Sequence, residues 1–292
     1  MKHALRELEC NGASVRAQTN PTIQLTYIFP QTANFVINVD TTQKVSNKKS
    51  AAAIAKGWDS FHDKLGRITT SITTVVFVSS INIESLRRKS VLEVGCGDLA
   101  STPAFEEVDY VGLDISQNAL DKARHKMAGN LKFNALNSVE LIKADIRSGV
   151  NLPSGTFDFA FGVDSFPFFA ESLPDAIREI GRLLKVGGLL QFTTFHPQFI
   201  KEKSGIGLSA FGHFGYAANV DGPAGEMVAL DEVQIKRLLG SNGFQTMDIA
   251  TFTKRDARLK AIDFVGHERI GGLDGSDENL KFFSVVKALR RD

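Results

Sequence analysis

Residues Ser90–Ala100 read SVLEVGCGDLA, and Tyr110–Ser116 read YVGLDIS. The first stretch predicts a short apolar strand that ends at a glycine turn, and the second predicts a strand that ends in the acid Asp114. Glycines suit such a turn because the backbone bends sharply and can approach a ligand without a Cβ in the way. Loop N–H groups there can bind an anionic ligand end, and the Asp114 carboxylate can accept hydrogen bonds from both hydroxyls of a ribose. The two stretches therefore predict a nucleoside-binding site at the ends of two strands.

Strands and helices alternate outward from this site across residues 90–195. Further strands are expected at Val139–Lys143, Phe157–Val163 and Leu189–Phe195, with helices between them. Such alternation implies parallel βαβ units and a doubly wound sheet. We expect the main domain to cover residues 90–292.

Two segments precede this domain. Residues 1–50 contain two strand-like stretches, Ile23–Phe29 and Asn34–Val39. These stretches suit a hairpin laid on the main domain, a disordered arm or a dimer-forming arm. Residues 51–89 are expected to form a helical cap, although the pattern over 68–83 does not separate helix from strand.

Composition indicates an ordinary globular protein. Hydrophobic residues make up 43% of the 292 residues, charged residues make up 23%, and the formal net charge is +1. A nearly neutral chain gives no basic field that would favour nucleic acid or an anionic membrane as a partner. The two cysteines give no disulfide framework, and the sequence has neither a signal peptide nor a stretch apolar enough to cross a membrane. We therefore expect a cytoplasmic protein without nucleic-acid or membrane partners.

Two interpretations of the glycine turn compete. Gly95, Gly97 and Ala100 fit the G-x-G-x-x-G/A fingerprint of dinucleotide-binding Rossmann domains. The acid Glu93 inside the first strand favours the other interpretation, because (L/V)-(D/E)-x-G-x-G resembles the first motif of the class I S-adenosylmethionine-dependent methyltransferases.

Three later stretches resemble the same family in the same order. LIKADI (141–146) ends a third strand in an acid, where that family contacts the adenine. FDFAFGVDSFPFF (157–169) resembles the fourth-strand motif beside the transfer site, and LLKVGGLL (183–190) resembles the loop that leads into strand five. The resemblance covers residues 90–195 by motif and 230–290 by architecture only.

The resemblance implies a Rossmann-like seven-stranded, mostly parallel sheet with helices on both faces, in which the last strand, Lys281–Ala288, runs antiparallel. It also implies S-adenosylmethionine as the donor, with its methionine end near the glycine turn, its ribose on Asp114 and its adenine between Asp145 and Ile146. The donor-binding residues expected on this basis are Glu93, Gly95, Cys96, Gly97, Asp114, Ile115, Asp145, Ile146 and Asp164.

The sequence departs from the family pattern at two positions. Leu99 stands where the third glycine of G-x-G-x-G is usual, and Val186 replaces the proline of L-K-P-G-G. The first change is expected to alter the donor loop, and the second costs loop rigidity but not the turn.

The acceptor side is expected to be closed by residues 51–89 and by an insertion at 196–229. His196 is the candidate general base, and Asp164 would lie beside the transferring methyl group. The candidate substrate-binding residues are Trp58, His62, Phe166, His213 and Tyr216. Several phenylalanines are expected beside the mouth of the acceptor site, which suggests a pocket for an apolar molecule, although core packing explains several of them equally well. They are Phe166, Phe168, Phe169, Phe195, Phe199, Phe211 and Phe214.

These observations predict a methyltransferase that acts on oxygen or nitrogen of a small, partly apolar molecule. Other options stay open: methylation of RNA or protein, a non-catalytic protein that keeps the fold, and a nicotinamide-dependent oxidoreductase. No metal site is expected, because no H-E-x-x-H or C-x-x-C spacing is present. The acceptor and the oligomeric state, with a homodimer as one option, are not determined by the sequence.

Overall fold

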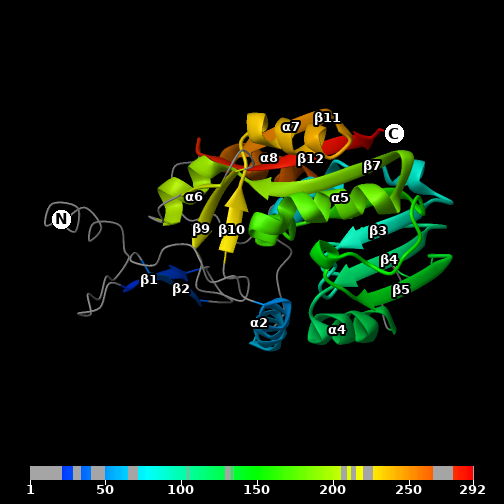
Figure 1. Ribbon diagram of the computed structural model, residues 1–292, viewed down its shortest axis with the longest axis horizontal. Helices are drawn as coiled ribbons and strands as arrows, with labels where there is room; N and C mark the ends of the chain where they lie inside the picture. The colour runs from blue at the N-terminus through cyan, green and yellow to red at the C-terminus, as the bar shows by residue number, and fades with distance from the viewer. Residues whose placement is uncertain are drawn as a thin grey trace, which may run out of the picture.

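The computed structural model describes residues 22–28, 34–40, 50–64, 72–103, 105–128, 133, 135–204, 209–211, 215–219, 226–265 and 279–291 (Figure 1). The strands are β1 (Thr22–Ile28), β2 (Asn34–Asp40), β3 (Ser90–Val94), β4 (Asp109–Asp114), β5 (Ser138–Lys143), β6 (Phe157–Gly162), β7 (Leu184–Phe195), β8 (Ser209–Phe211), β9 (Gly215–Asn219), β10 (Glu226–Ala229), β11 (Phe244–Thr253) and β12 (Lys281–Arg290). The α-helices are α2 (Ala51–Lys64), α3 (Ile72–Ser79), α4 (Gln117–Ala128), α5 (Leu173–Leu183), α6 (Pro197–Ser204), α7 (Glu232–Ser241) and α8 (Lys254–Val265). Short 3-10 helices are η2 (Ile83–Leu86), η4 (Ile146–Ser148) and η5 (Phe166–Ser172).

One mixed sheet forms the centre of the fold. Strands β5, β4, β3, β6 and β7 lie side by side and parallel, with β5 at the outer edge. Strand β12 pairs antiparallel with β7 and carries β11 on its other side. These seven strands confirm the expected Rossmann-like sheet with an antiparallel last strand.

Helices cover both faces of this sheet, and each face has its own apolar core. Helix α5 places Leu173, Ile177 and Ile180 on one face at helical spacing, where they pack with Leu92 and Leu190. Helices α3, α4 and α8 supply the core on the opposite face, which the strand side chains reach in alternation: Val76, Leu120, Ala257, Val91 and Phe161. The two cores make the sheet doubly wound, as its motifs predict.

The segment after β7 extends the sheet further than the sequence predicts. Strand β10 pairs with β7 through Ala229 and Phe195, and β9 and β8 follow antiparallel. The described part of the insertion at 196–229 therefore consists of helix α6 followed by strands β8, β9 and β10, which extend the sheet. The sequence predicts only a lid here.

The two strand-like stretches before residue 50 form a hairpin. Strands β1 and β2 pair antiparallel from Thr22 with Asp40 to Ile28 with Asn34. Of the options that the sequence leaves open for residues 1–50, the described strands agree with a hairpin. The undecided stretch at 68–83 contains helix α3, and the short helix η2 begins at its last residue. None of the described helices has both the length and the apolar character needed to span a bilayer.

Candidate active site

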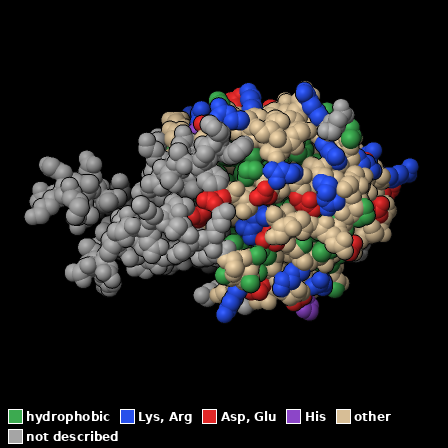
Figure 2. Space-filling model, in the orientation of Figure 1, with side chains coloured by type: hydrophobic (Ala, Val, Ile, Leu, Met, Phe, Trp, Pro, Cys, Tyr) green, Lys and Arg blue, Asp and Glu red, His purple; other side chains and the backbone are tan. Residues whose placement is uncertain are grey.

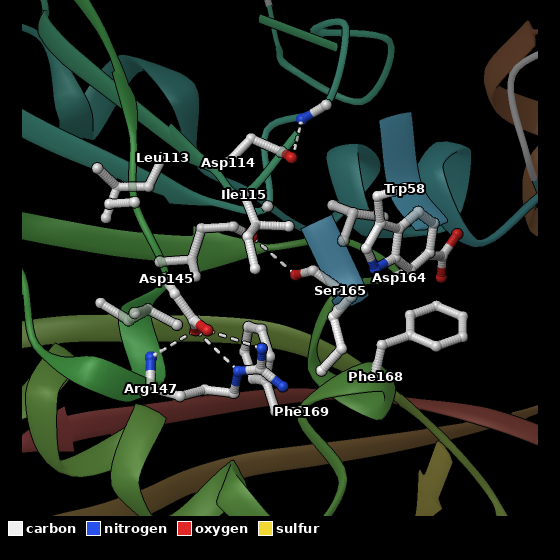
Figure 3. A pocket seen from close by; sticks show the side chains of 17 residues that line it. Trp58, Leu113, Asp114, Ile115, Asp145, Arg147, Asp164, Ser165, Phe168 and Phe169 are labelled. Carbon is white, nitrogen blue, oxygen red and sulfur yellow. Dashed lines mark hydrogen bonds and ion pairs between the residues drawn. The ribbon is translucent and has the colours of Figure 1, made fainter. Parts of the chain in front are cut away.

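A cavity opens at the carboxyl ends of four neighbouring parallel strands, where ligands of open α/β sheets bind (Figure 3). Each strand contributes its last residues or the residues that directly follow it. These lining residues are Val94, Gly95 and Gly97 at the end of β3, Leu113, Asp114 and Ile115 at the end of β4, Ala144, Asp145, Ile146 and Arg147 after β5, and Val163, Asp164 and Ser165 after β6. Helix α2 adds Ile54 and Trp58, and η5 adds Phe168 and Phe169. The cavity thus has a polar set at the strand ends and an apolar set on the helices.

The glycine turn after β3 has the conformation that requires a glycine. Gly95 has a φ of +73°, and a Cβ built on it would lie 2.4 Å from the Cβ of Ser165. Ser165 is itself fixed, because its Oγ donates to the Val94 carbonyl at 2.7 Å. The N–H groups of Gly95 and Cys96 both donate to the Leu113 carbonyl, at 2.8 and 3.0 Å, so the turn is tied to β4.

Asp114 links the glycine turn to the start of helix α4. Its Oδ2 accepts from the Gly97 N–H and its Oδ1 from the Ser116 N–H, both at 2.8 Å. Each carboxylate oxygen has a second lone pair, so both can still accept from a ligand hydroxyl. The Asp114 carboxylate is therefore held in one orientation where it lines the cavity.

Glu93 and Cys96 lie outside the cavity, which corrects their expected role as donor-binding residues. Glu93 is 1% exposed, and its Oε2 accepts from the hydroxyls of Thr102 and Tyr110, both at 2.6 Å. A buried carboxylate needs such donors, so Glu93 ties β3 to the chain beyond the glycine turn. Burial, together with the negative charges of Glu93 and Asp114, raises the pKa of the Cys96 thiol well above its usual value. The Cys96 side chain is therefore a neutral filler.

Replacing Tyr110 by phenylalanine is expected to lower the free energy of unfolding by about 1–3 kcal/mol, because the buried Glu93 carboxylate loses a hydroxyl donor. Burial and the charge of Glu93 also raise the pKa of Tyr110 well above 10.0. The unfolded chain therefore loses this proton first as the pH rises above about 10, and the stability that wild-type Tyr110 contributes falls there. Urea denaturation at neutral and alkaline pH is the measurement. A variant as stable as the wild type at neutral pH, with the same alkaline loss, would show that this contact contributes nothing.

The third position of the glycine motif keeps the backbone of a glycine although it carries a leucine. Leu99 has a φ of +63°, in the left-handed region that glycine favours. Its side chain is fully buried and packs in the core with Phe105, Tyr110 and Phe161. The packing of the buried side chain offsets the cost of this backbone conformation, so Leu99 can keep a left-handed backbone although it is not glycine.

This arrangement predicts an unusual order of stability at Leu99. Both Leu99→Ala and Leu99→Gly should lose about 2–5 kcal/mol of unfolding free energy through the lost packing. With alanine, the left-handed φ still costs roughly 1–2 kcal/mol of strain, whereas glycine adopts the same φ without that cost. The glycine variant should therefore be at least as stable as the alanine variant in chemical denaturation. An alanine variant more stable by the usual margin of about 1 kcal/mol would contradict the role given to this backbone.

The end of β5 places a carboxylate and a guanidinium together in the cavity wall. Asp145 caps η4, and its Oδ1 accepts from the Arg147 N–H at 3.1 Å and from Arg147 Nε at 2.7 Å. Its Oδ2 accepts from Arg147 Nη2, also at 2.7 Å (Figure 3). The side chains of Asp145 and Arg147 are only 14% and 13% exposed. The sequence predicts Asp145 and Ile146 at this site, but not Arg147.

Helix α2 spans the cavity between α4 and η5. The Trp58 ring meets the Phe168 ring edge to face, with centroids 5.2 Å apart. On the other side, Asp59 Oδ1 accepts from Ser116 Oγ at 2.7 Å and from the Asn118 N–H at 3.2 Å. Burial acts to raise the pKa of Asp59, but the hydrogen bond from Ser116, the N–H groups of α4 and the charge of Lys143 outweigh it and lower the pKa. An ionised Asp59 thus docks α2 on the N-terminus of α4, beside α2 in Figure 1.

Asp164 lines the cavity at the end where Trp58 and Phe168 meet, apart from Asp145 and Arg147 (Figure 3). Its φ of +55° is uncommon for a residue with a Cβ. The Asp164 N–H donates to Thr193 Oγ1 at 2.8 Å, and its Oδ2 accepts from Thr73 Oγ1. Threonines of α3 and β7 therefore fix the orientation of this carboxylate.

His196 and Phe166 do not line the cavity, which corrects both expected roles. The Nδ1 atom of His196 accepts from the Gln198 N–H at 3.2 Å, so the neutral ring carries its proton on Nε2. Burial and the nearby Lys281 lower the pKa of His196, although Asp231 acts in the opposite direction. No lone pair of this ring is therefore placed for a general base. Phe166 is fully buried and stacks on Phe192, with ring centroids 4.4 Å apart.

The remaining expected residues are placed unequally. Trp58, Gly95, Gly97, Asp114, Ile115, Asp145, Ile146 and Asp164 all line the cavity. His213 and the side chains of His62 and Tyr216 lie outside the described residues. Sequence reasoning missed Ile54 and Arg147, which carry no motif signal, and also Ser165, although Ser165 lies within the fourth-strand motif at 157–169.

Charged side chains of the described residues neither group into a metal site nor form a field of one sign on the face seen in Figure 2. Among the described residues, no three His, Cys, Asp or Glu side chains are grouped so that they could hold a metal ion. Acidic and basic side chains lie interspersed over the described part of the face in Figure 2. This face therefore offers no basic surface of the kind that binds a polyanion.

A family model described as "Methyltransferase domain" matches residues 92–192. The match begins in β3 and ends in β7, so it contains all four strand ends that line the cavity.

Curated relatives agree with this match at low identity. The chain is 26% identical over 162 residues to a malonyl-[acyl-carrier protein] O-methyltransferase of Legionella pneumophila, which is 53% of each protein. It is 24% identical over 180 residues to a protein of the same name from a Paenibacillus species, which is 60% of this chain and 62% of the relative. The chain thus spans little more than half the length of these relatives.

Solved structures share the fold. A 1,6-didemethyltoxoflavin-N1-methyltransferase of Burkholderia thailandensis, solved with bound 1,6-didemethyltoxoflavin and S-adenosylhomocysteine, has a TM-score of 0.59 at 15% identity, over 91% of this chain and 98% of that chain. The CcbJ methyltransferase of Streptomyces caelestis has a TM-score of 0.54 at 15% identity, over 84% of this chain and 100% of that chain.

Proposed function

We propose that this chain, whose residues 92–192 form a class I S-adenosylmethionine-dependent methyltransferase domain, transfers a methyl group to oxygen or nitrogen of a small, partly apolar molecule. The observation that carries the proposal is the position of Asp114. Its carboxylate lines the cavity at the end of β4 while two backbone N–H groups hold it in place. A fixed pair of carboxylate oxygens beside a glycine turn suits the two hydroxyls of a ribose.

The cavity residues fit S-adenosylmethionine. Gly95 and Gly97 line the cavity without a side chain of their own, and an acid lies at the carboxyl end of both β4 and β5. Gly95 and Gly97 would face the methionine part of the donor, Asp114 would bind the ribose, and Asp145 and Ile146 would flank the adenine. When bound, the donor supplies a methyl group on a sulfonium, which needs an aligned acceptor lone pair rather than a metal ion.

The acceptor would enter at the end of the cavity that contains Asp164. Trp58 and Phe168 are apolar surfaces there, and they would hold an apolar acceptor body and exclude water. The Asp164 carboxylate would accept the proton of an acceptor O–H or N–H, or orient that group if it is already deprotonated. Positioning of the acceptor would supply much of the rate.

The names of the relatives guide the choice of acceptor atom. Both curated relatives described above are named O-methyltransferases, and the Burkholderia protein is named an N-methyltransferase with a heteroaromatic acceptor. Oxygen acceptors are therefore the first class to test, and ring nitrogens are the second. The interspersed charges in Figure 2 support a small acceptor over RNA.

An activity screen tests this proposal. The purified chain is incubated with S-adenosylmethionine and a panel of hydroxyl, carboxyl and amine metabolites, and products are detected by the added mass of one methylene unit. Asp164→Asn is the matched variant, since it keeps the size of the side chain and removes its charge. We expect a product with the wild type and at least a roughly tenfold lower turnover with the variant, about 1.4 kcal/mol of barrier. Donor binding without methylation of any small molecule, but with methylation of RNA or protein, would overturn the small-molecule acceptor.

A further inference from the structure

Arg147 differs from Arg88 and Arg178, whose side chains are likewise recorded with acid partners alone, because it is nearly buried: its side chain is 13% exposed, against 84% and 67%. All of its recorded hydrogen bonds, from N–H, Nε and Nη2, go to the Asp145 carboxylate. Both side chains are nearly buried in the cavity wall. Fixing Arg147 and Asp145 to each other costs side-chain entropy, and the pair joins no other parts of the described fold. We therefore expect this pair to act on what binds in the cavity.

Arg182 is the natural comparison. It forms a similar forked pair with Glu179, with Nε at 2.9 Å from Oε2 and Nη2 at 2.6 Å from Oε1. Arg182 also donates to the carbonyls of Val150 and Leu152, and Glu179 accepts from the Val150 N–H. That pair holds α5 to the loop before β6 and does not line the cavity. The Arg147 fork has no such structural partners, and it fixes only the acid that lines the cavity.

We propose that Arg147 is a positioning residue that makes the end of β5 selective for a nucleobase with an exocyclic amino group. The proposal rests on the proposed function, which places the donor base beside Asp145. The guanidinium occupies one side of the carboxylate with parallel hydrogen bonds, so the carboxylate cannot rotate about its own axis. The lone pairs that remain accept hydrogen bonds but cannot donate one, so of the two exocyclic groups of a purine they suit an amino group and not an oxo group.

The same pair excludes the wrong base. The carboxylate accepts both hydrogen bonds of the guanidinium and offers only acceptor lone pairs to a ligand, so an oxo group in place of the amino group would face it acceptor to acceptor. Without Arg147, the carboxylate could turn away from the base and no longer distinguish the two groups. Arg147 therefore controls both the affinity for an aminopurine and the discrimination against an oxopurine.

Calorimetric titration with two ligands tests this role without any need for an acceptor. The ligands are S-adenosylhomocysteine and S-inosylhomocysteine; the second carries an oxo group in place of the amino group of the purine and a proton on the adjacent ring nitrogen. Arg147→Met keeps the length of the side chain and removes the fork. We expect its affinity for S-adenosylhomocysteine to fall roughly tenfold. The ratio of the two affinities should fall by at least about fivefold. Arg147→Lys should give intermediate values, because it keeps the charge without the fork.

Arg182→Met is the matched control: it should lower thermal stability and leave both affinities unchanged. Asp145→Asn should lower the affinity ratio in the same way as Arg147→Met, and the double variant should lose little more than either single one, since the two residues act together. An unchanged affinity ratio in Arg147→Met, or additive losses in the double variant, would overturn the inference. A wild-type protein that binds neither ligand would instead overturn the proposed function. If Arg147→Met does not fold, Arg147→Lys alone decides, because it keeps the charge and changes the geometry.

Discussion

Replacing Gly95 by valine is expected to abolish measurable binding of S-adenosylhomocysteine, a loss on the order of 100-fold or more in affinity. The added Cβ would lie 2.4 Å from the Cβ of Ser165, and the φ of +73° forces a branched residue into the left-handed region. Ser165 cannot easily move away, because its hydroxyl is bonded to the Val94 carbonyl. The loop must therefore rearrange where the donor would lie.

Gly155→Val is the matched control for this prediction. Gly155 has a similar φ of +65°, but a Cβ on it would meet nothing within 4 Å. This variant should lose some stability from the strained backbone and bind the ligand normally. Circular dichroism checks that both variants fold, and calorimetry measures the affinity. If Gly95→Val bound as well as the wild type, the turn would be merely structural.

Replacing Asp114 by alanine is expected to cost about 1–3 kcal/mol of binding free energy for S-adenosylhomocysteine, roughly 5- to 150-fold in affinity. The variant loses the acceptors for the ribose hydroxyls and also releases the N–H groups of Gly97 and Ser116. Both effects weaken the same end of the cavity.

Asp109→Ala serves as the control on the same strand. Asp109 is the first residue of β4 and lies at the opposite end of that strand from Asp114. Its carboxylate accepts from Ser138 Oγ at 2.8 Å. Its loss should leave ligand affinity unchanged. Equal affinities in the wild type and Asp114→Ala would mean that the ribose lies elsewhere.

The parts of the fold that are predictable from sequence are those with local signals. An apolar strand, a glycine turn and an acid at the next strand end occur within SVLEVGCGDLA and YVGLDIS, and they fix where the cavity forms. Short apolar strands alternating with helices fix the doubly wound sheet. The helical nature of α3 is less predictable. Six successive residues of the run ITTVVFVS are buried, so its apolar residues show neither the helical period nor the strand period.

Side-chain orientation is less predictable than chain path. Phe166 and Phe168 are two residues apart in η5, yet the first lies in the core and the second lines the cavity. The backbone of η5 is kinked at Ala170, so no regular period assigns these rings to faces. His196 follows β7 as expected, but its ring nitrogen Nδ1 accepts a hydrogen bond from the backbone N–H of Gln198. Arg147 reaches Asp145 only because η4 turns between them.

Titration of the wild-type chain with S-adenosylhomocysteine, beside a parallel titration with a nicotinamide dinucleotide, tests the central claim most directly. The glycine turn and Asp114 are compatible with both ligands by spacing alone, but the acid after β5 and the match over residues 92–192 favour the first. The account predicts saturable binding of S-adenosylhomocysteine at a single site and no binding of the dinucleotide. Binding of the dinucleotide without S-adenosylhomocysteine would contradict it.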